Sequence, residues 1–224
     1  MSNDRNFTHR ILLINPNSSV PTTEMMVGIA QAAAAGACEI AGATARRAPP
    51  MIVEPDALAA AADEVVEIAA SNDGKYDGFI VAAFGDPGLA KVRERCRTPA
   101  VGIAESACRE ASSGGRRFGI ATTTPALKAA IDRRVALLGL SAQYTGLRIT
   151  SADPAELVKD KDRLRDALAD VVRHCVDDDG AEAVIIGGGP LGEAARELAP
   201  MFSIPIVAPI PAAIRSILAI LART

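Results

Sequence analysis

The alternation of short apolar runs with longer Ala-rich segments limits the fold of this chain more than any other feature. Runs such as Ile11–Ile14 and Val184–Ile186 are apolar throughout, as in parallel strands buried on both faces. The segments between them are long enough for helices, so the pattern predicts an α/β protein with mostly parallel sheets. Strands are expected at residues 10–15, 39–44, 78–83, 100–103, 117–121, 143–149, 183–187 and 204–207. Helices are expected at residues 22–35, 57–70, 88–96, 125–138, 163–176, 192–201 and 212–222.

Composition and charge exclude several classes of partner. Aromatic residues make up only 3% of the 224 residues, so Ala, Val, Ile and Leu must form the core. A net charge of −3 gives no electrostatic reason to bind nucleic acid. The apolar runs are shorter than the ~20 residues that a membrane span needs. The polar N-terminus lacks an apolar signal core. We therefore expect a soluble, cytoplasmic protein with a small-molecule ligand and neither nucleic acid nor a membrane as partner.

The cysteines and histidines do not form a metal-binding pattern. The four cysteines are Cys38, Cys96, Cys108 and Cys175. They are widely spaced, with no C-x-x-C pair, so buried small hydrophobic residues are their simplest interpretation. His174 lies near an expected helix end, where a cation is favourable without any chemistry. No metal and no cofactor are expected.

An internal repeat divides the chain into two similar halves. Residues 79–103 and 184–210 each run through a strand, a Gly/Pro turn, a helix, an X-Pro step and a second strand. This predicts two pseudo-symmetric α/β lobes, each with a mostly parallel sheet flanked by helices. The first lobe is expected to comprise residues 1–111 plus 208–224, and the second residues 112–207. The ligand site is expected in the cleft where the carboxyl ends of both sheets meet.

In each half of the chain, a polar loop follows the first strand. Asn15, Ser18 and Ser19 can cap the next helix, or they can bind a ligand oxygen together with free N–H groups at the helix start. Thr122 and Thr123 belong to a run of three threonines that offers hydroxyl groups at the equivalent place, although one threonine is expected to be a cap. Both readings remain open for these loops.

In each half, a further loop follows the third strand. In the segment Phe84-Gly85-Asp86-Pro87-Gly88, Asp86 is either a helix cap or an acid/base at the cleft mouth. Glu105, at the end of the next strand, is either a general base or a residue that favours a helix start. Gly188 and Gly189 allow backbone to approach a ligand closely. They do not form a G-x-G-x-x-G or Walker pattern, so dinucleotide and nucleoside-triphosphate binding are disfavoured.

At these loops the sequence resembles the aspartate/glutamate/hydantoin racemase superfamily, most closely its hydantoin and allantoin racemase branch. The resemblance rests on residues 14–19, 84–89, 101–107 and 179–182, and it extends from about Arg10 to Ala213. It implies two pseudo-symmetric α/β lobes, a site between them, and neither cofactor nor metal. It also implies two cysteines that face each other across the cleft, one removing the α-proton as a thiolate and the other protonating the opposite face.

The positions of those two family cysteines fall on Ala83 and Gly188, and neither carries a thiol. Either both thiols were removed in the laboratory, or the chain belongs to a natural divergent branch. Glycine is an unusual replacement for cysteine, and the turn Gly189-Pro190-Leu191 departs from the family's usual Ala-Gly-Met type. The sequence therefore favours natural divergence.

We expect a cofactor-independent, isomerase-type enzyme, racemase- or epimerase-like, that acts on a small cyclic amide, hydantoin-like or amino-acid-like substrate. Asp86 and Glu105 are the acid/base candidates. The substrate-binding candidates are Asn15, Ser18, Ser19, Ala83, Phe84, Gly85, Thr122, Thr123, Gly188 and Gly189. A lyase or hydrolase acting on a related carbonyl substrate is one alternative, and a non-catalytic small-molecule binding protein is another. Formation of a homo-oligomer stays open, because the apolar face around Ile214 and Ile217 suits a core or a subunit interface.

Overall fold

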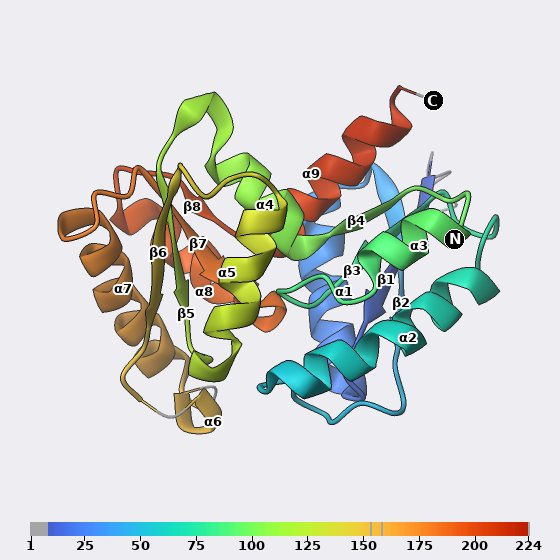
Figure 1. The fold of residues 1–224 in the computed structure, drawn as a ribbon, viewed down its shortest axis with the longest axis horizontal. Helices are drawn as coiled ribbons and strands as arrows, with labels where there is room; N and C mark the ends of the chain where they lie inside the picture. Colours follow the sequence, from blue (N-terminus) through green and yellow to red (C-terminus); the bar gives the residue numbers. More distant parts are fainter. Residues whose placement is uncertain (1–8, 153, 158, 224) are drawn as a thin grey trace, which may run out of the picture.

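Two four-stranded parallel sheets form the centre of the molecule (Figure 1). The computed structural model describes residues 9–152, 154–157 and 159–223. The strands are β1 (His9–Asn15), β2 (Cys38–Thr44), β3 (Gly78–Val81), β4 (Ala100–Gly102), β5 (Phe118–Thr122), β6 (Tyr144–Ile149), β7 (Ala183–Gly187) and β8 (Ile206–Val207). Their orders are β2-β1-β3-β4 and β6-β5-β7-β8, so the two sheets repeat one topology. The predicted α/β fold with two pseudo-symmetric lobes is confirmed.

Helices flank both sheets. They are α1 (Val20–Ala34), α2 (Pro55–Ser71), α3 (Leu89–Arg95), α4 (Ile103–Ala111), α5 (Lys128–Leu137), α6 (Pro154–Leu157), α7 (Lys161–Asp177), α8 (Gly192–Leu198) and α9 (Pro209–Leu221). Two of them, α4 and α6, lie outside the ranges expected from the sequence. Helix α4 begins directly after Gly102, the last residue of β4, so no loop separates this strand from the helix. Within the described residues, no helix is long and apolar enough to cross a membrane.

The apolar strands are buried on both faces, as their sequences predict. In β1, Ile11 and Leu13 pack on the side of α1 and α9, whereas Leu12 and Ile14 pack on the side of α2 and α3. This alternation follows from the two-residue period of a strand. The second sheet is covered by α7 and α8 on one face and by α4 and α5 on the other.

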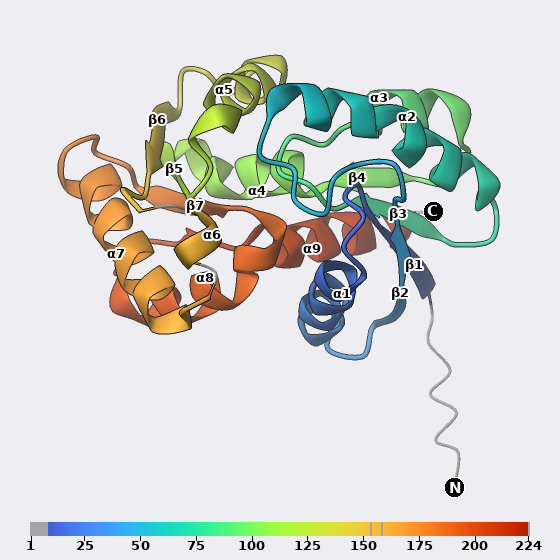
Figure 2. The ribbon, with the colours of Figure 1, turned by 90° about the horizontal axis from the view of Figure 1, so that it is seen from below.

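The two lobes exchange a helix. Helix α4 follows the last strand of the first sheet, yet Ala104, Ala107 and Cys108 pack with Phe118 and Ile185 of the second sheet. Helix α9 follows the last strand of the second sheet and packs against the first sheet, so its apolar face belongs to the core. Figures 1 and 2 show both helices at the centre of the molecule. The lobe boundaries expected from the sequence stay a prediction, because these two helices are shared.

Candidate functional site

A cavity of about 430 Å³ lies between the two lobes. Its wall is formed by residues 82–84, 122–124 and 187–191 at the carboxyl ends of β3, β5 and β7, together with the start of α1 and residues 51–53. The carboxyl ends of parallel strands are the usual place for a ligand site in an open α/β sheet. The cavity therefore lies where the repeat places the site.

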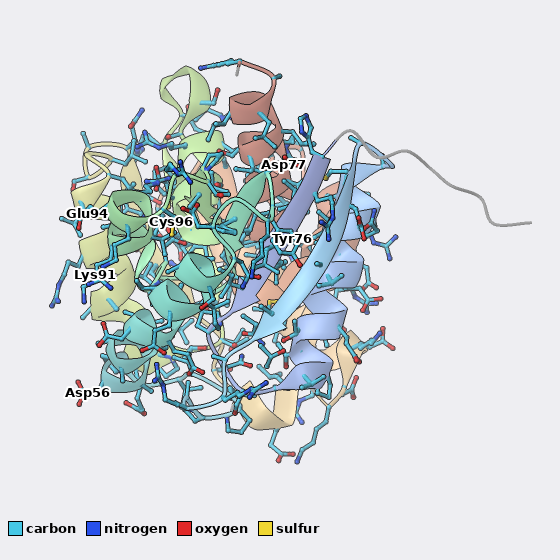
Figure 3. The ribbon with its side chains drawn as sticks, turned by 90° about the vertical axis from the view of Figure 1, so that its right-hand side faces the viewer. Asp56, Tyr76, Asp77, Lys91, Glu94 and Cys96 are labelled. Atoms are coloured by element: carbon cyan, nitrogen blue, oxygen red, sulfur yellow. The ribbon has the colours of Figure 1, made fainter. Side chains whose placement is uncertain are left out.

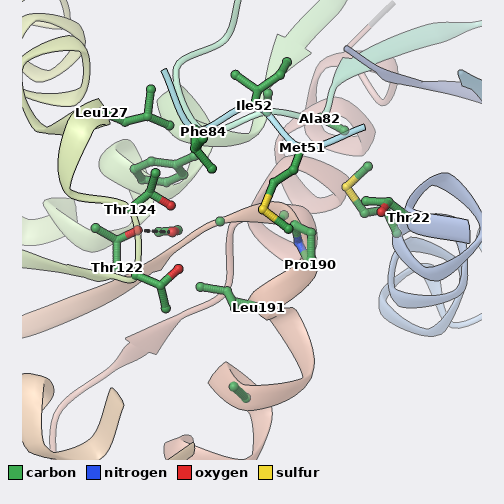
Figure 4. Close-up of a pocket in the computed structure, with 18 of the residues that line it drawn as sticks. Thr22, Met51, Ile52, Ala82, Phe84, Thr122, Thr124, Leu127, Pro190 and Leu191 are labelled. Atoms are coloured by element: carbon green, nitrogen blue, oxygen red, sulfur yellow. Dashed lines mark hydrogen bonds between the residues drawn. The ribbon is translucent and has the colours of Figure 1, made fainter. Parts of the chain in front are cut away.

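The lining of the cavity is mostly apolar. Figure 4 shows Phe84 and Leu127 on one side, Thr22 on the other, and Met51 reaching between them. Polar groups come from Asn17, the three threonines 122–124 and Thr22. The charged residues of the lining are Lys161, Glu193 and Glu197. Such a site suits a ligand with an apolar body and a few polar atoms.

The pairing register of the two sheets relates Ala83 to Gly188. Asn15 and Thr122 are equivalent, because each carbonyl accepts a hydrogen bond from the residue that follows the neighbouring strand, β2 or β6. The residue before Asn15 pairs with Val81, and the residue before Thr122 pairs with Ile186. Two residues further along each strand are Ala83 and Gly188. Both line the cavity, so the pseudo-twofold brings these two positions to one site.

The first polar loop is organised by its own side chains. Asn15 is fully buried, and its amide nitrogen donates to Asn17 Oδ1 at 2.8 Å and to Thr23 Oγ1 at 2.9 Å. Ser19 Oγ accepts from the N–H of Thr22 at 3.3 Å and so caps α1. These bonds orient Asn17, the residue of this loop that lines the cavity. In the second loop, Thr122 Oγ1 donates to the Gly187 carbonyl at 2.7 Å and joins β5 to β7 (Figure 4).

The loop between β2 and α2 covers one side of the cavity. Its base is bound by Glu64 of α2, whose carboxylate oxygens accept the backbone N–H groups of Arg46 at 2.8 Å and Arg47 at 2.9 Å. Its middle is bound by the N–H of Ser18, which donates to the Pro49 carbonyl at 3.3 Å. Met51 is 47% exposed although it is large and apolar, so it is available to a ligand at the mouth of the cavity.

Comparison with known proteins agrees with this geometry. Residues 11–217 match the Asp/Glu/hydantoin racemase family. The chain belongs to this family. It is 29% identical to a hydantoin racemase of Paenarthrobacter aurescens over 208 residues, which is 92% of this chain and 88% of the relative. The structure of an allantoin racemase from Klebsiella pneumoniae superimposes with a TM-score of 0.90 at 28% identity, covering 96% of this chain and 89% of the other. An allantoin racemase from Pseudomonas fluorescens has the same fold, with a TM-score of 0.90 at 24% identity over 96% and 91% of the chains.

The lining of the cavity includes part of the predicted binding set. The predicted residues that line the cavity are Ala83, Phe84, Thr122, Thr123, Gly188 and Gly189. The predicted residues that do not are Asn15, Ser18, Ser19 and Gly85. The first three of these shape the loop that carries Asn17, and Gly85 packs against Leu58 behind the wall. Ser19 is the cap of α1, whereas Asn15 accepts the N–H of Asn17 at 3.1 Å, which lies before the helix.

Neither acid/base candidate lines the cavity. The Asp86 side chain is fully buried, and it accepts hydrogen bonds from the N–H groups of Ala104 at 2.9 Å and Glu105 at 2.8 Å. Arg134 Nη2 lies 2.9 Å from Asp86 Oδ2 and 3.1 Å from Glu105 Oε2. Burial raises the pKa of Glu105, but Arg93, Arg109 and Arg134 outweigh burial and lower it overall. This arrangement supports a structural role for both carboxylates. Their predicted catalytic role stays a prediction.

The four cysteines all lie in the described part of the chain, and none of them lines the cavity. Burial raises the pKa values of Cys108 in α4 and Cys175 in α7 to about 12, so neither is a thiolate at neutral pH. Cys38 is buried in β2, and half-buried Cys96 lies at the end of α3 (Figure 3). Among the residues that the structure describes, no group of three or more His, Cys, Asp or Glu side chains could hold a metal ion.

Apart from Ala83 and Phe84, sequence reasoning missed the apolar part of the wall. The residues concerned include Met25, Met26, Met51, Ile52, Leu58, Leu127, Ile131 and Leu164. Most of them lie on helices. The sequence pattern of a helix predicts an apolar residue to be part of the core whether it faces a sheet or a cavity. Met51 carried the one usable signal, because an apolar run directly after Pro49-Pro50 is unusual for a solvent-exposed loop.

Asp86 is expected to make stability fall as pH rises. Burial raises its pKa from 3.8 to about 6, although Arg134 and the N–H groups of Ala104 and Glu105 lower it. The folded protein therefore binds this proton more tightly than the unfolded chain. The resulting stabilisation is complete below pH 3.8 and is lost as pH rises through about 6. Urea unfolding measures the free energy of unfolding of the wild type and of Asp86→Asn. The wild-type value minus the Asp86→Asn value should fall by about 2 kcal/mol between pH 4 and 7. A difference that rises over this range would show that Asp86 stays ionised.

Proposed function

We propose that the protein binds a small cyclic amide or amino-acid-like carbonyl compound in the interlobe cavity. The observation that carries this proposal is the pair of symmetry-related positions, Ala83 and Gly188, which line one cavity and lack any group that exchanges protons. These are the positions to which the resemblance assigns the family's two cysteines. The proposal is therefore a racemase-family binding site in which thiol-based proton transfer does not occur.

The lining fits this class of ligand. The apolar side chains, among them Met26, Phe84 and Leu127, suit the apolar substituent of a 5-substituted hydantoin. Within the described part of the chain, the backbone N–H groups of residues 83, 84, 188 and 189 donate no hydrogen bond. Such groups, with the Asn17 amide, supply donors for the ring carbonyl oxygens.

Isomerase-type proton exchange on the same ligand is the second candidate, and membership of the racemase family favours it. The titratable residues of the lining are Lys161, Glu193 and Glu197. Lys161 Nζ lies 2.9 Å from Glu193 Oε2. The hydrogen bond and the charge of the lysine ammonium lower the pKa of the Glu193 carboxyl. Proton exchange by a titratable side chain would have to use one of these three residues, since neither Asp86 nor Glu105 lines the cavity. The lyase or hydrolase alternative stays a prediction.

The test is proton NMR in D₂O with the enantiomers of 5-benzylhydantoin, allantoin and aspartate, combined with thermal unfolding. We expect at least one cyclic amide to bind and to stabilise the folded state, by about 2.7 kcal/mol at a hundredfold excess over Kd. The α-proton signal should decay no faster than in a sample without protein. Catalysed loss of that signal would select the isomerase candidate instead.

A pair of variants locates the binding. Ala83→Phe fills the cavity and should abolish the stabilisation. Ala90→Phe introduces the same side chain at an exposed position of α3 and should leave the stabilisation unchanged. The proposal fails if no compound of the panel stabilises the protein, or if both variants bind equally well.

A further inference from the structure

A cluster of charged side chains joins the two lobes directly behind the wall of the cavity. Arg134 of α5 donates from Nε to Asp86 Oδ2 at 3.0 Å and from Nη2 to Glu105 Oε2 at 3.1 Å. Asp86 lies in the loop after β3, and Glu105 lies in the first turn of α4. The exposed fractions of the three side chains are 18% for Arg134, 0% for Asp86 and 12% for Glu105. The guanidinium of α5 therefore binds a loop of the first sheet and α4, which covers the second sheet together with α5.

The partners of Arg134 have further bonds that fix their positions. Both Asp86 oxygens accept backbone N–H groups at the start of α4, from Ala104 and Glu105. Glu105 also receives Arg93 Nη1 at 3.0 Å and Arg109 Nε at 3.1 Å. Because both carboxylates are held in this way, the position of Arg134 fixes α5 relative to the loop after β3.

The segments joined by this cluster form the cavity wall. Phe84, two residues before Asp86, lines the cavity, and so does Ile131, three residues before Arg134 on α5. The two side chains also line a small hollow on the far side of the wall, together with Arg134 itself. The wall between the cavity and the charged cluster is thus one side chain thick at this place.

We propose that Arg134 is a positioning residue for the interlobe cavity, which through Asp86 and Glu105 places the loop carrying Ala83 and Phe84 against α5. The affinity part of this inference rests on the proposed ligand-binding function. Removing the guanidinium leaves a buried carboxylate without its cation, and this carboxylate can regain water only if the loop moves away from α5. Lysine restores the charge but not two planar bonds, so Arg134→Lys is expected to restore the positioning in part.

Two readouts test the proposal. The first is the Kd of 5-benzylhydantoin, measured well below the unfolding temperature. The second needs no ligand: Ala83→Cys is introduced into each protein, and the alkylation rate of this thiol by iodoacetamide is followed by peptide mass spectrometry. Arg215→Met is the matched control, because Arg215 binds both oxygens of Glu110, at 2.7 and 2.9 Å, and also joins two helices, but it lies away from the cavity.

We expect Arg134→Met to raise the Kd by about tenfold and to change the alkylation rate at position 83 by about fivefold. Arg134→Lys should fall between the wild type and Arg134→Met, and Arg215→Met should stay within twofold of the wild type in both readouts. If Arg134→Met does not fold, Arg134→Lys takes its place.

An alkylation rate within twofold of the wild type overturns the proposal. Equal changes in Arg215→Met also overturn it, because they would reflect general loosening. So does an unchanged Kd in a protein whose alkylation rate has changed. If the wild type binds none of the compounds, the proposed function fails, and the alkylation rate alone decides the role of Arg134.

Discussion

The double substitution Ala83→Cys and Gly188→Cys is expected to accelerate α-proton exchange of 5-benzylhydantoin by about 10³-fold over the unsubstituted protein. The register of the two sheets makes these positions equivalent, and both line the cavity. Racemisation needs a proton acceptor on one face of the carbon and a donor on the other, and a thiol supplies either role at neutral pH. No cysteine of the chain lines the cavity now, so any new exchange would come from the introduced groups.

The two positions are not equally tolerant of a side chain. Ala83 already carries a Cβ, so Ala83→Cys adds one sulfur atom at the wall of the cavity. Gly188 has φ of +154°, and a Cβ there would lie 3.1 Å from Leu191 Cδ1. Gly188→Cys is therefore expected to cost about 1–3 kcal/mol of stability. The additional substitution Leu191→Ala should recover part of this cost, because it removes the crowding atoms.

Proton NMR in D₂O and optical rotation measure the two parts of the reaction. Each single cysteine variant should exchange more slowly than the double variant, because only one face of the carbon then has a thiol. A double variant with Ala83→Ser and Gly188→Ser controls for size and polarity. Retained hydantoin binding without faster exchange in the double cysteine variant would show that the two positions do not face the reacting carbon.

The part of the site that could be predicted from sequence is the part built on strand ends. Phe84, Thr122 and Gly188 lie at or just after the ends of buried strands, and the carboxyl ends of parallel strands meet at one edge of a sheet. The internal repeat added that two such edges form one site. These arguments use only local pattern and topology, which is why six of the ten predicted binding residues line the cavity.

The role of Asp86 could not be predicted in the same way. An Asp before Pro in a strand-to-helix loop suits both a helix cap and an acid/base, and local pattern does not separate them. The structure shows a third arrangement, in which Asp86 caps not the adjacent helix but α4, eighteen residues away in sequence. Its cation, Arg134, is 48 residues away on another lobe. Only the exchange of α4 between the lobes brings these groups together, and nothing in an Ala-rich helix indicates which sheet it covers.

Replacing Gly102 by alanine is expected to lower the free energy of unfolding by about 3–5 kcal/mol. Gly102 has φ of −109° and ψ of 152°, which alanine adopts without strain, so backbone conformation gives no reason for a loss. The reason is space. A Cβ at this position would overlap the buried Asp86 carboxylate, with Oδ2 only 2.6 Å away. The carboxylate would have to leave the N–H groups of Ala104 and Glu105 as well as Arg134, with no water to replace them.

Urea unfolding of five proteins (the wild type, Gly102→Ala, Gly28→Ala, Asp86→Ala and the double variant of Asp86→Ala with Gly102→Ala) separates this explanation from a general intolerance of alanine. Gly28→Ala is the matched control, because it lies inside α1 with no heavy atom within 4 Å of a Cβ, and it should stabilise by about 0.5–1 kcal/mol. In an Asp86→Ala background, Gly102→Ala should cost less than about 1 kcal/mol, since the clashing group is gone. If the stability costs of Gly102→Ala and Asp86→Ala add in the double variant, Gly102 is required for a reason other than the carboxylate beside it. A strong coupling between the two substitutions would show that glycine is required at position 102 because the Asp86 carboxylate occupies the space of a Cβ. It would then follow that this carboxylate helps to hold the two lobes together.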